Sequence, residues 1–484
     1  MLGLGLGPYV LIVLYLALIA GALVSIVRMP AVGLFVLIPL IPNQTVRYKL
    51  HEMPYGAQLV DFVLIAVAIG IILKGNTLFS KASFRVPIFA LWALTFVTLW
   101  TGSLLNDFPL PLTEGDERFS NWKNYARIFL IPFLAMGAIR TRKQMFIAIA
   151  LMCAGLAWSD RGFLFSLRGR SFTNFSYGLR DMGTMPIAGE NGVAAFFAQM
   201  AVFLFGFAAT RKFLERQALT LLAIITTVCV VFTFSRGAYV ALAISFLLVC
   251  LLKRRMLLVV TAGVLIVTLA GGYALVPGAV IDRVTMLHTS DGALESSAAG
   301  RMVMWTLALD MFMSNPLFGS GFDTFRLLAG YGGLHDTHNY YLRLLAEMGI
   351  LGLLVYLALL AAAIWSCWRL YRDASDDDRM LSGLAVGGLG YMVCVALLNV
   401  FGDRWSFLEI TGYTCIIMGM VARGNQLLED PSEDTERAAE EDEEAEEEEA
   451  EEAEASPAEA RDEAEAAIGE AARPVTDRRV RSAG

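Results

Sequence analysis

The stretch HDTHNYYLRLLAEMGILGLLVY, residues 335–356, places two of the chain's four histidines just ahead of an apolar run. His338 falls at the predicted start of a membrane span that begins near Leu342. Unpaired backbone N–H groups and the helix dipole disfavour a protonated imidazole at such a position. We therefore expect a neutral His338 near pH 7, as a general base requires, with a purely structural interfacial histidine as the alternative. Arg343 and Glu347, four residues apart on the same span, are expected to form a structural ion pair.

Two arginines have unusual positions. Arg236, in TFSRGAYVAL, falls in a two- or three-residue turn between two apolar runs, on the side of the membrane that basic residues normally avoid. Arg301 starts an apolar helix of about 14 residues that Asn315 and Pro316 should end. This helix is short for a span, so we expect it to lie along the outer membrane surface. For each arginine the alternative is an anchor to lipid headgroups.

A metal site is the alternative use of the histidines, because His335, His338 and His288 fall in one loop and ligands three residues apart can share a helical face. No nearby motif supplies a matching carboxylate or thiolate set. The six cysteines fall within or at the ends of apolar runs, and no CxxC pair occurs. Neither a metal nor a cofactor is expected.

Membrane-spanning helices must position these residues. Of the 484 residues, 56% are hydrophobic and 17% are charged, and the mean hydropathy is +0.58, which is too apolar for a soluble globular domain. The sequence predicts an all-α polytopic membrane protein with 12 or 13 transmembrane helices and one long extracytoplasmic loop that contains short interfacial helices. The spans are expected near residues 8–27, 56–73, 87–106, 125–139, 144–158, 192–210, 218–234, 238–252, 256–276, 342–365, 380–400 and 405–422. Segment 31–42 is the uncertain thirteenth, because Pro30, Pro39 and Pro42 crowd it.

Lys and Arg gather on one side of these spans, which we interpret as the cytoplasm. The opposite side then receives loops 107–124, 159–191 and 277–341. Whether the amino terminus lies inside or outside stays open. No cleavable signal peptide is indicated.

Loop 159–191 is basic, against this trend. Its arginines are Arg161, Arg168, Arg170 and Arg180. They are expected to help hold an anionic lipid carrier. Simple headgroup contacts, or a different orientation of this loop, are the alternatives.

The end of the chain differs from the rest. Residues 429–484 carry 23 acidic and 6 basic side chains and almost no large apolar ones. Such a segment cannot bury enough surface to offset its chain entropy, so we expect a disordered acidic cytoplasmic tail. A docking arm for a basic partner is the alternative.

The segment from Thr233 to about Leu360 resembles the O-antigen ligase and O-antigen polymerase superfamily of bacterial membrane glycosyltransferases. The matching motifs are FSRGA, GRMVMW, NPLFGSGFDTF and HNYYLRLLAEMGILGLL, of which the last is the most specific. RMPAVGLFVLIPLIPN and GENGVAAFF are similar to stretches of the exosortase-associated O-glycosylation ligases. The expected organisation is an N-terminal transmembrane region at 1–190, a ligase-like core at 191–424 with the outer loop 277–341, and the tail at 425–484.

The resemblance implies transfer of a glycan from an undecaprenyl-diphosphate carrier to an acceptor hydroxyl, at the outer face of the bacterial inner membrane. His338 would be the general base, and Arg236 and Arg301 would hold the donor diphosphate, in a metal-independent, inverting displacement. The candidate accessory residues are His335, Asn339, Arg161 and Arg180. The acceptor would be lipid A core in a ligase, another glycan in a polymerase, or a protein side chain in a protein O-oligosaccharyltransferase, and the sequence does not separate these.

The residue chemistry agrees with these roles. Guanidinium groups can bind a departing diphosphate with two parallel hydrogen bonds, and a sugar hydroxyl is weakly nucleophilic until a base takes its proton. No GxxxxGK[ST] loop and no basic stretch interleaved with aromatics occurs, so neither nucleotide-driven transport nor nucleic-acid binding is expected. The expected partners are the lipid-linked donor, the acceptor and membrane lipids. A transporter or lipid-carrier flippase is the alternative from another class, and it would place charges deep within the spans.

Overall fold

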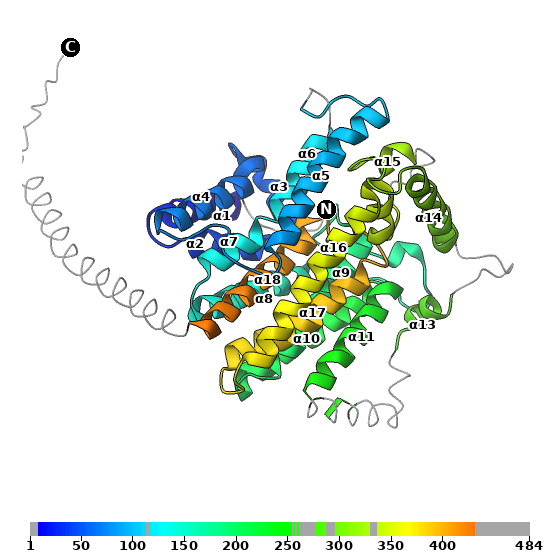
Figure 1. Ribbon diagram of the computed structural model, residues 1–484. Helices are drawn as coiled ribbons and strands as arrows, with labels where there is room; N and C mark the ends of the chain where they lie inside the picture. The colour runs from blue at the N-terminus through cyan, green and yellow to red at the C-terminus, as the bar shows by residue number, and fades with distance from the viewer. Residues whose placement is uncertain are drawn as a thin grey trace, which may run out of the picture. The chain divides into compact units, whose positions relative to one another are not determined.

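The computed structural model describes residues 8–112, 117–253, 276–286, 296–329 and 336–430, and the single positions 256, 259, 260 and 263. These residues form helices and no strand (Figure 1). Residues Met1–Glu429 make one compact unit. The predicted tail, apart from its first residues, lies outside the described residues.

The helices follow one another along the chain, with connections of different lengths. The α-helices are α1 (Pro8–Val27), α2 (Ala31–Leu37), α3 (Gln44–Leu50), α4 (Leu59–Leu73), α5 (Arg85–Leu105), α6 (Glu117–Ile128), α7 (Ile131–Ala138), α8 (Arg142–Ser166), α9 (Gly189–Ala208), α10 (Phe213–Phe232), α11 (Arg236–Leu252), α13 (Gly278–Thr285), α14 (Ser296–Ser314), α15 (Phe325–Leu328), α16 (Tyr340–Asp373), α17 (Arg379–Leu398) and α18 (Leu408–Glu429). Three short 3₁₀ turns are Ile38–Leu40, Gly56–Gln58 and Tyr177–Leu179.

Eight helices of the described residues are long and apolar enough to cross a membrane. They are Tyr9–Val27, Gly56–Leu73, Arg85–Leu105, Arg142–Ser166, Gly189–Ala208, Phe213–Phe232, Tyr340–Asp373 and Arg379–Leu398. Each corresponds to a predicted span. The chain is therefore an all-α, multi-pass membrane protein.

The remaining predicted spans differ from the structure. The prediction for 125–139 is wrong, because the chain there forms two pieces, α6 and α7, separated at Phe129 and Leu130. Pro132 lies in the first turn of α7, where its missing N–H costs nothing, but it could not continue α6. Segment 31–42 forms only α2 and a 3₁₀ turn, and α11 has 17 residues. Most of 256–276 lies outside the described residues.

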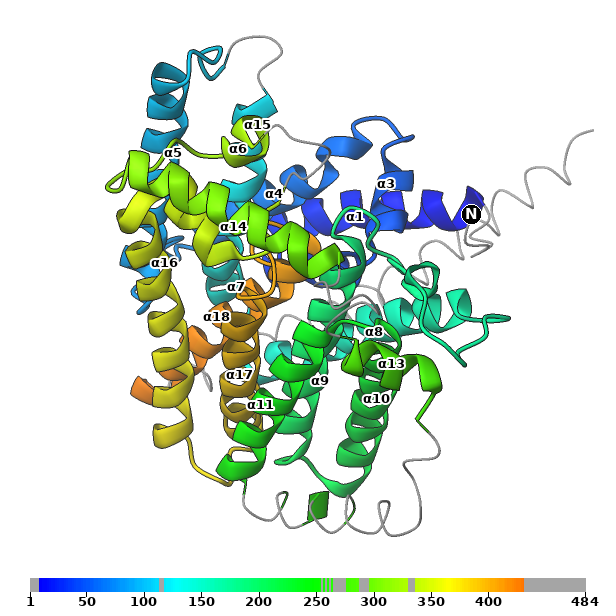
Figure 2. The same ribbon diagram turned by 90° about the vertical axis from the view of Figure 1, so that its right-hand side faces the viewer.

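The predicted span 405–422 corresponds to α18, which begins later and runs further, to Glu429. Glu409 and Arg423 make it less apolar than the eight spans, yet nearly all its side chains are buried. It packs against α7, α16 and α17 (Figure 2). Burial inside the bundle therefore gives its polar groups protein partners in place of lipid.

The centre of the bundle is formed by α9 and α17. Gly206 of α9 and Gly387 of α17 face each other so closely that a Cβ added at Gly206 would lie 2.7 Å from the Cα of Gly387. Small residues at such a crossing let two helix backbones approach, as is common between membrane helices. The helices α10, α11 and α16 pack around this pair.

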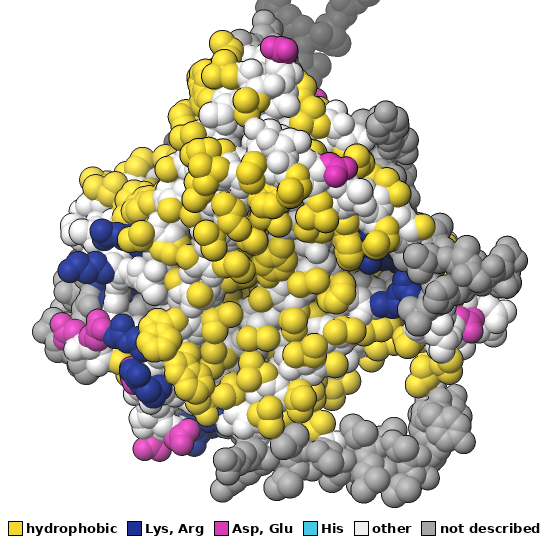
Figure 3. Space-filling view, turned by 45° about the vertical axis from the view of Figure 1, so that its right-hand side comes forward, with side chains coloured by type: hydrophobic (Ala, Val, Ile, Leu, Met, Phe, Trp, Pro, Cys, Tyr) yellow, Lys and Arg dark blue, Asp and Glu magenta, His cyan; other side chains and the backbone are white. Residues whose placement is uncertain are grey.

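A broad face of the molecule is covered by apolar side chains, and charged side chains are confined to its margins (Figure 3). Among the exposed apolar residues on α16 are Leu354, Leu357, Trp365 and Trp368. Exposed apolar area of this extent suits contact with lipid. It agrees with the assignment of α16 as a membrane span.

Candidate active site

His338 lies immediately before α16, as predicted, and the helix begins two residues earlier than Leu342. Asn339 is the N-cap, since its side-chain oxygen accepts hydrogen bonds from the backbone N–H groups of Tyr341 (3.0 Å) and Leu342 (3.2 Å). His338 itself has a left-handed backbone with φ of 51°. The cap therefore fixes the point at which the histidine leaves the helix.

Asp336 is the nearest acidic neighbour of His338. One carboxylate oxygen accepts the backbone N–H of His338 at 3.0 Å, and the other lies 3.1 Å from the imidazole Nδ1. The second contact has an ion-pair distance but does not meet the geometric requirements of a hydrogen bond. A carboxylate on the Nδ1 side leaves Nε2 as the nitrogen that can accept a proton.

The carboxyl group of Asp336 stays ionised at physiological pH. Burial raises its pKa, but the close contact with the His338 side chain and its charge, together with the charges of Arg404 and Arg343, outweigh burial and lower the pKa to about 2. The side chains of His338 and Asp336 are 37% and 36% exposed. The pair is therefore accessible from outside the bundle.

Arg343 joins α16 to the rest of the site. The predicted pair with Glu347 is present, at 3.2 Å, and Arg343 also binds Asp403 at 2.5 Å and Asp323 at 3.3 Å. The three carboxylates come from three separate chain segments. Arg343 therefore connects these three chain segments in the first turn of the helix that follows His338.

Arg236 begins α11, and residues 233–235 form the predicted turn from α10. Its Nη1 donates a hydrogen bond of 2.6 Å to the carbonyl of Met286, at the end of α13. Two more arginines donate to carbonyls of the same turn: Arg180 to Thr233 at 3.4 Å and Arg283 to Phe234 at 3.2 Å. Arg180 and Arg283 thus bind this turn, and Arg236, which follows the turn, binds the end of α13.

Arg301 lies within α14, and the prediction that it starts this helix is wrong. The helix begins five residues earlier, at Ser296, and has 19 residues, because the Ser and Ala residues before Arg301 are compatible with a helical start. It ends at Ser314, as Asn315 and Pro316 predicted. In Figure 2, α14 runs across the long axis of α16, and Met302, Val303 and Met313 are exposed, which suits a helix at a membrane surface.

Trp305 connects α14 to the histidine segment. Its indole N–H donates a hydrogen bond of 2.9 Å to the carbonyl of Thr337, the residue before His338. Arg301 is one helical turn earlier than Trp305 and therefore on the same side of α14. This places Arg301 toward the segment that carries His338.

Arg404 lies in the connection between α17 and α18, within electrostatic reach of Arg301 and Arg180. Burial lowers the pKa of Arg404, and the positive charges of Arg301 and Arg180 lower it further, against the opposing effect of Asp336 and Asp403. Burial also lowers the pKa of Arg180, which is paired with Glu190 at 2.8 Å and lies within the electrostatic reach of Arg283 and Arg301. The arginines therefore share one electropositive region beside His338.

The family described as O-antigen ligase matches residues 221–357. This match supports membership of the O-antigen ligase superfamily. The matched ligase segment runs from α10 into α16 and contains Arg236, Arg283, Arg301 and His338. The match therefore supports a role in glycan transfer. No curated protein sequence matches the chain.

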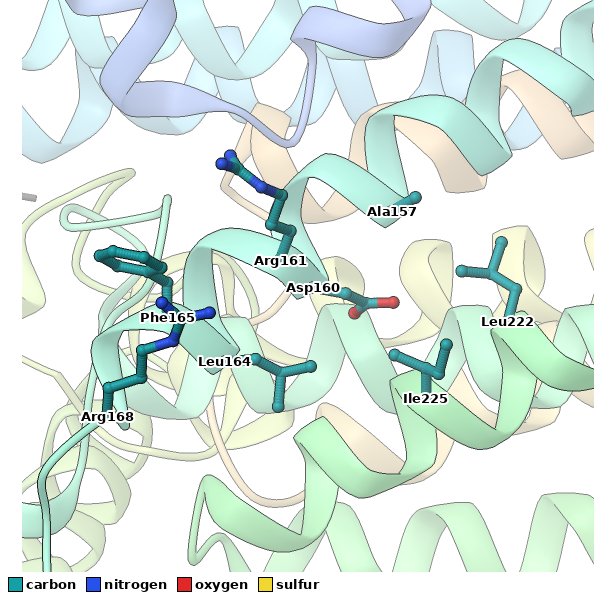
Figure 4. Close-up of a pocket in the computed structure, with 8 residues that line it drawn as sticks. All are labelled: Ala157, Asp160, Arg161, Leu164, Phe165, Arg168, Leu222 and Ile225. Carbon is teal, nitrogen blue, oxygen red and sulfur yellow. The ribbon is translucent and has the colours of Figure 1, made fainter. Parts of the chain in front are cut away.

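Two of the predicted accessory residues lie outside the ligase segment and differ in their surroundings. Arg180 joins the arginine cluster, whereas Arg161 packs near the Trp158 ring, 5.9 Å from its centroid. Arg161 and Arg168 line a cavity of about 540 Å³ between α8 and α10, and Asp160 points toward α10 from the same helix (Figure 4). Arg170 is paired with Asp181 at 2.5 Å. Of the four basic residues in loop 159–191, the structure brings only Arg180 to the ligase site.

The metal alternative involves residues that fall outside the described part of the chain, namely His288 and His335. Within the described part, no three His, Cys, Asp or Glu side chains come together as a metal site requires. Asn339 is described and has a structural role as the cap of α16.

Sequence reasoning missed Asp336, Arg283 and Arg404. Asp336 stands two residues before His338, where a short acidic side chain commonly binds nearby backbone N–H groups. Arg404 carries the same signal that marked Arg236, an arginine in a short connection between apolar helices. Arg283 has no comparable signal, because its importance depends on contacts with residues far away in the sequence.

Proposed function

We propose that the chain transfers a glycan from an undecaprenyl-diphosphate carrier to an acceptor hydroxyl at the outer face of the bacterial cytoplasmic membrane. The observation that carries the proposal is the position of His338, which has a carboxylate on its Nδ1 side and arginines around it. These are the groups that such a transfer needs: a base for the hydroxyl and cations for the diphosphate.

In the proposed reaction, Nε2 of His338 takes the proton of the acceptor hydroxyl as its oxygen attacks the anomeric carbon of the donor sugar. The bond between that carbon and the diphosphate oxygen breaks, its electron pair leaves with undecaprenyl diphosphate, and the anomeric configuration inverts. Asp336 orients the imidazole and stabilises its protonated form. The proton passes to water when the product leaves.

Arg236 and Arg301 are proposed to hold the donor diphosphate, and Arg180 to support them. Guanidinium groups match phosphate oxygens in shape and remain charged throughout. A diphosphate leaves with low basicity, so neither an acid nor a metal is needed to release it. Ligase, polymerase and protein-glycosylation activities all fit this arrangement, because each needs the same base and the same cations.

The transporter alternative receives less support. It calls for charged groups deep within the spans, whereas the arginines described above gather at one end of the bundle.

The test is transfer by the purified full-length protein from an undecaprenyl-diphosphate-linked glycan to lipid A core, a second glycan or a peptide. His338→Ala should abolish transfer while donor binding survives. His51→Ala is the matched control, because His51 is exposed at the end of α3 and has no proposed role. Normal turnover by His338→Ala would exclude it as the base. Loss of activity in EDTA that zinc restores would support a metal site.

A further inference from the structure

Arg404 is a buried cation without a carboxylate partner. Its residue is 6% exposed, and no carboxylate of the described residues lies within 4.0 Å of its guanidinium group. Among the described residues, the guanidinium group of Arg404 makes one hydrogen bond, from Nη1 to the backbone carbonyl of Asp403 at 3.3 Å. Arg343, in the same site, has three carboxylates. Arg343 is therefore neutralised by ion pairs within the protein, whereas Arg404 makes no ion pair with a described residue.

The position of Arg404 is fixed by its backbone. Its N–H donates to the side-chain oxygen of Asn399 at 3.0 Å, and its carbonyl accepts from the hydroxyl of Thr411, also at 3.0 Å. Its guanidinium group lies over Gly402, where any Cβ would collide with it. The backbone of Arg404 is thus fixed, whereas its guanidinium group makes no ion pair with the nearby carboxylates of Asp336 and Asp403.

The segment that holds Arg404 also holds the histidine. The backbone N–H of Tyr340, two residues after His338, donates to the carbonyl of Asn399 at 2.9 Å. Arg343 and Asp403 make a second connection, at 2.5 Å. Arg301 approaches the histidine segment from α14, through Trp305 and Thr337. Arg404 and Arg301 therefore lie around one short segment, 336–340.

A buried charge without an ion-pair partner is costly, and departures of this kind are expected at functional sites. The charges of Asp336 and Asp403 offset this cost only in part, since the pKa of Arg404 remains lowered. Here the cost is increased by the neighbouring Arg301 and Arg180. An anion entering this region would neutralise several guanidinium groups at once.

We propose that Arg404 is a further binding residue for the donor diphosphate, supplied by the α17–α18 connection outside the matched ligase segment. This inference rests on the proposed function. A sugar diphosphate ester of a lipid carries two negative charges, one on each phosphate. When the bond to the sugar breaks, the phosphate that leaves gains a third. Arg236 and Arg301 would balance the resting donor, and Arg404 would stabilise the charge that develops as the leaving group departs.

The experiment compares Arg404→Gln with the wild-type full-length protein in detergent. The probes are undecaprenyl diphosphate and inorganic diphosphate, and binding is measured by titration and by the ligand-induced rise in melting temperature. Arg404→Gln should bind undecaprenyl diphosphate about 10- to 100-fold more weakly, the effect of losing a charge-assisted hydrogen bond. Its melting temperature without ligand should be unchanged or higher, because the cost of burying a charge that has no ion-pair partner is gone and offsets the lost attraction to Asp336 and Asp403.

Two further variants make the result specific. Arg404→Lys keeps the charge without the planar group and should recover only part of the binding. Arg127→Gln, which removes an arginine paired with Asp61 at 2.7 Å, is the matched control and should leave diphosphate binding unchanged. In transfer assays Arg404→Gln should lower kcat and raise the KM of the donor, with the KM of the acceptor unaltered.

Three results would overturn the assignment of Arg404. They are wild-type affinity for undecaprenyl diphosphate in Arg404→Gln, a changed KM for the acceptor alone, and a ligand-free melting temperature that falls in both Arg404→Gln and Arg404→Lys in step with binding. The second result would assign the anion to the acceptor, and the third would make Arg404 structural. Failure of the wild-type protein itself to bind undecaprenyl diphosphate would instead overturn the proposed function.

Discussion

Arg343 on α16 and Asp403 in the α17–α18 connection form an ion pair of 2.5 Å that joins two parts of the chain 60 residues apart. The carboxylate of Asp403 also shapes the connection. Its other oxygen accepts hydrogen bonds from the backbone N–H groups of Trp405 and Ser406 at 3.0 and 3.1 Å. One side chain therefore sets both the shape of the connection and its attachment to the helix that follows His338.

Replacing Asp403 with Asn should lower stability and transfer together. The amide keeps an oxygen for the backbone contacts but removes the charge opposite Arg343, at an expected cost of about 1–3 kcal/mol, since Arg343 retains two carboxylates. The melting temperature should fall by several degrees. Asp61→Asn, which breaks a more exposed pair with Arg127, should cost less than about 1 kcal/mol. Equal melting temperatures for the two variants would contradict a structural role for the Arg343–Asp403 pair.

Asp336→Asn should show a pH-dependent loss of stability. The folded pKa of about 2 lies below the ordinary 3.8, so the carboxylate contributes stability above about pH 4 and loses it as the pH falls toward 2. Because the side chain is 36% exposed, we expect about 1 kcal/mol at neutral pH. The difference in stability is measured from melting curves of the wild-type protein and Asp336→Asn between pH 3 and pH 7. The melting temperatures of the two proteins should converge at the acid end. A difference that grows on acidification would have the wrong sign.

Arg236→Ala and Arg301→Ala should each weaken donor binding as well as transfer, unlike His338→Ala, which should lose transfer alone. Lys at either position should restore little, because an ammonium group offers a point charge in place of two parallel hydrogen bonds. Binding of undecaprenyl diphosphate by each folded variant provides the measurement. Full affinity in both Ala variants would remove these arginines from the proposed diphosphate site.

Gly349→Ala should prevent correct folding. Gly349 has φ of 63° and ψ of −162° within α16, and an added Cβ would collide with the backbone of Leu317. We expect a loss above about 3 kcal/mol, seen as a failure to accumulate monodisperse protein. Gly75→Ala is the control, because Gly75 has a similar φ of 72° with open space around it, and strain alone should cost about 1–2 kcal/mol. Comparable behaviour of the two variants would show that backbone contact at Gly349 is unimportant.

Removal of residues 430–484 should leave transfer essentially intact. This segment has a strongly acidic composition with few large apolar side chains, and the proposed site is formed by residues of the preceding unit. Specific activity of the truncated and full-length proteins, measured with the same donor, decides the matter. A truncated protein that is folded but inactive would assign the tail a role in the reaction.

The sequence predicted those parts of the site that depend on local pattern. Apolar runs and their interruptions located His338 and Arg236, and spacing along one helix identified the Arg343–Glu347 pair. Asp403 and Asp323 could not be assigned to Arg343, because hydropathy does not specify which connections meet in space. The break between α6 and α7 was missed for a related reason, since a short run of apolar residues on either side of Pro132 has the hydropathy of a continuous span.

The interruption of α16 at Gly349 separates the start of this helix from the rest of the span. Backbone hydrogen bonds attach the residues around it to segment 316–321: Ser320 donates to Ala346, Gly321 to Glu347, and Ile350 to Pro316. The start of α16 is thereby fixed to segment 316–321, which follows α14 and contacts α5. Membrane spans tilt to match thicker or thinner bilayers, and this attachment should hold the start of α16 in place when the span does so. We therefore expect turnover to vary little between short-chain and long-chain lipids.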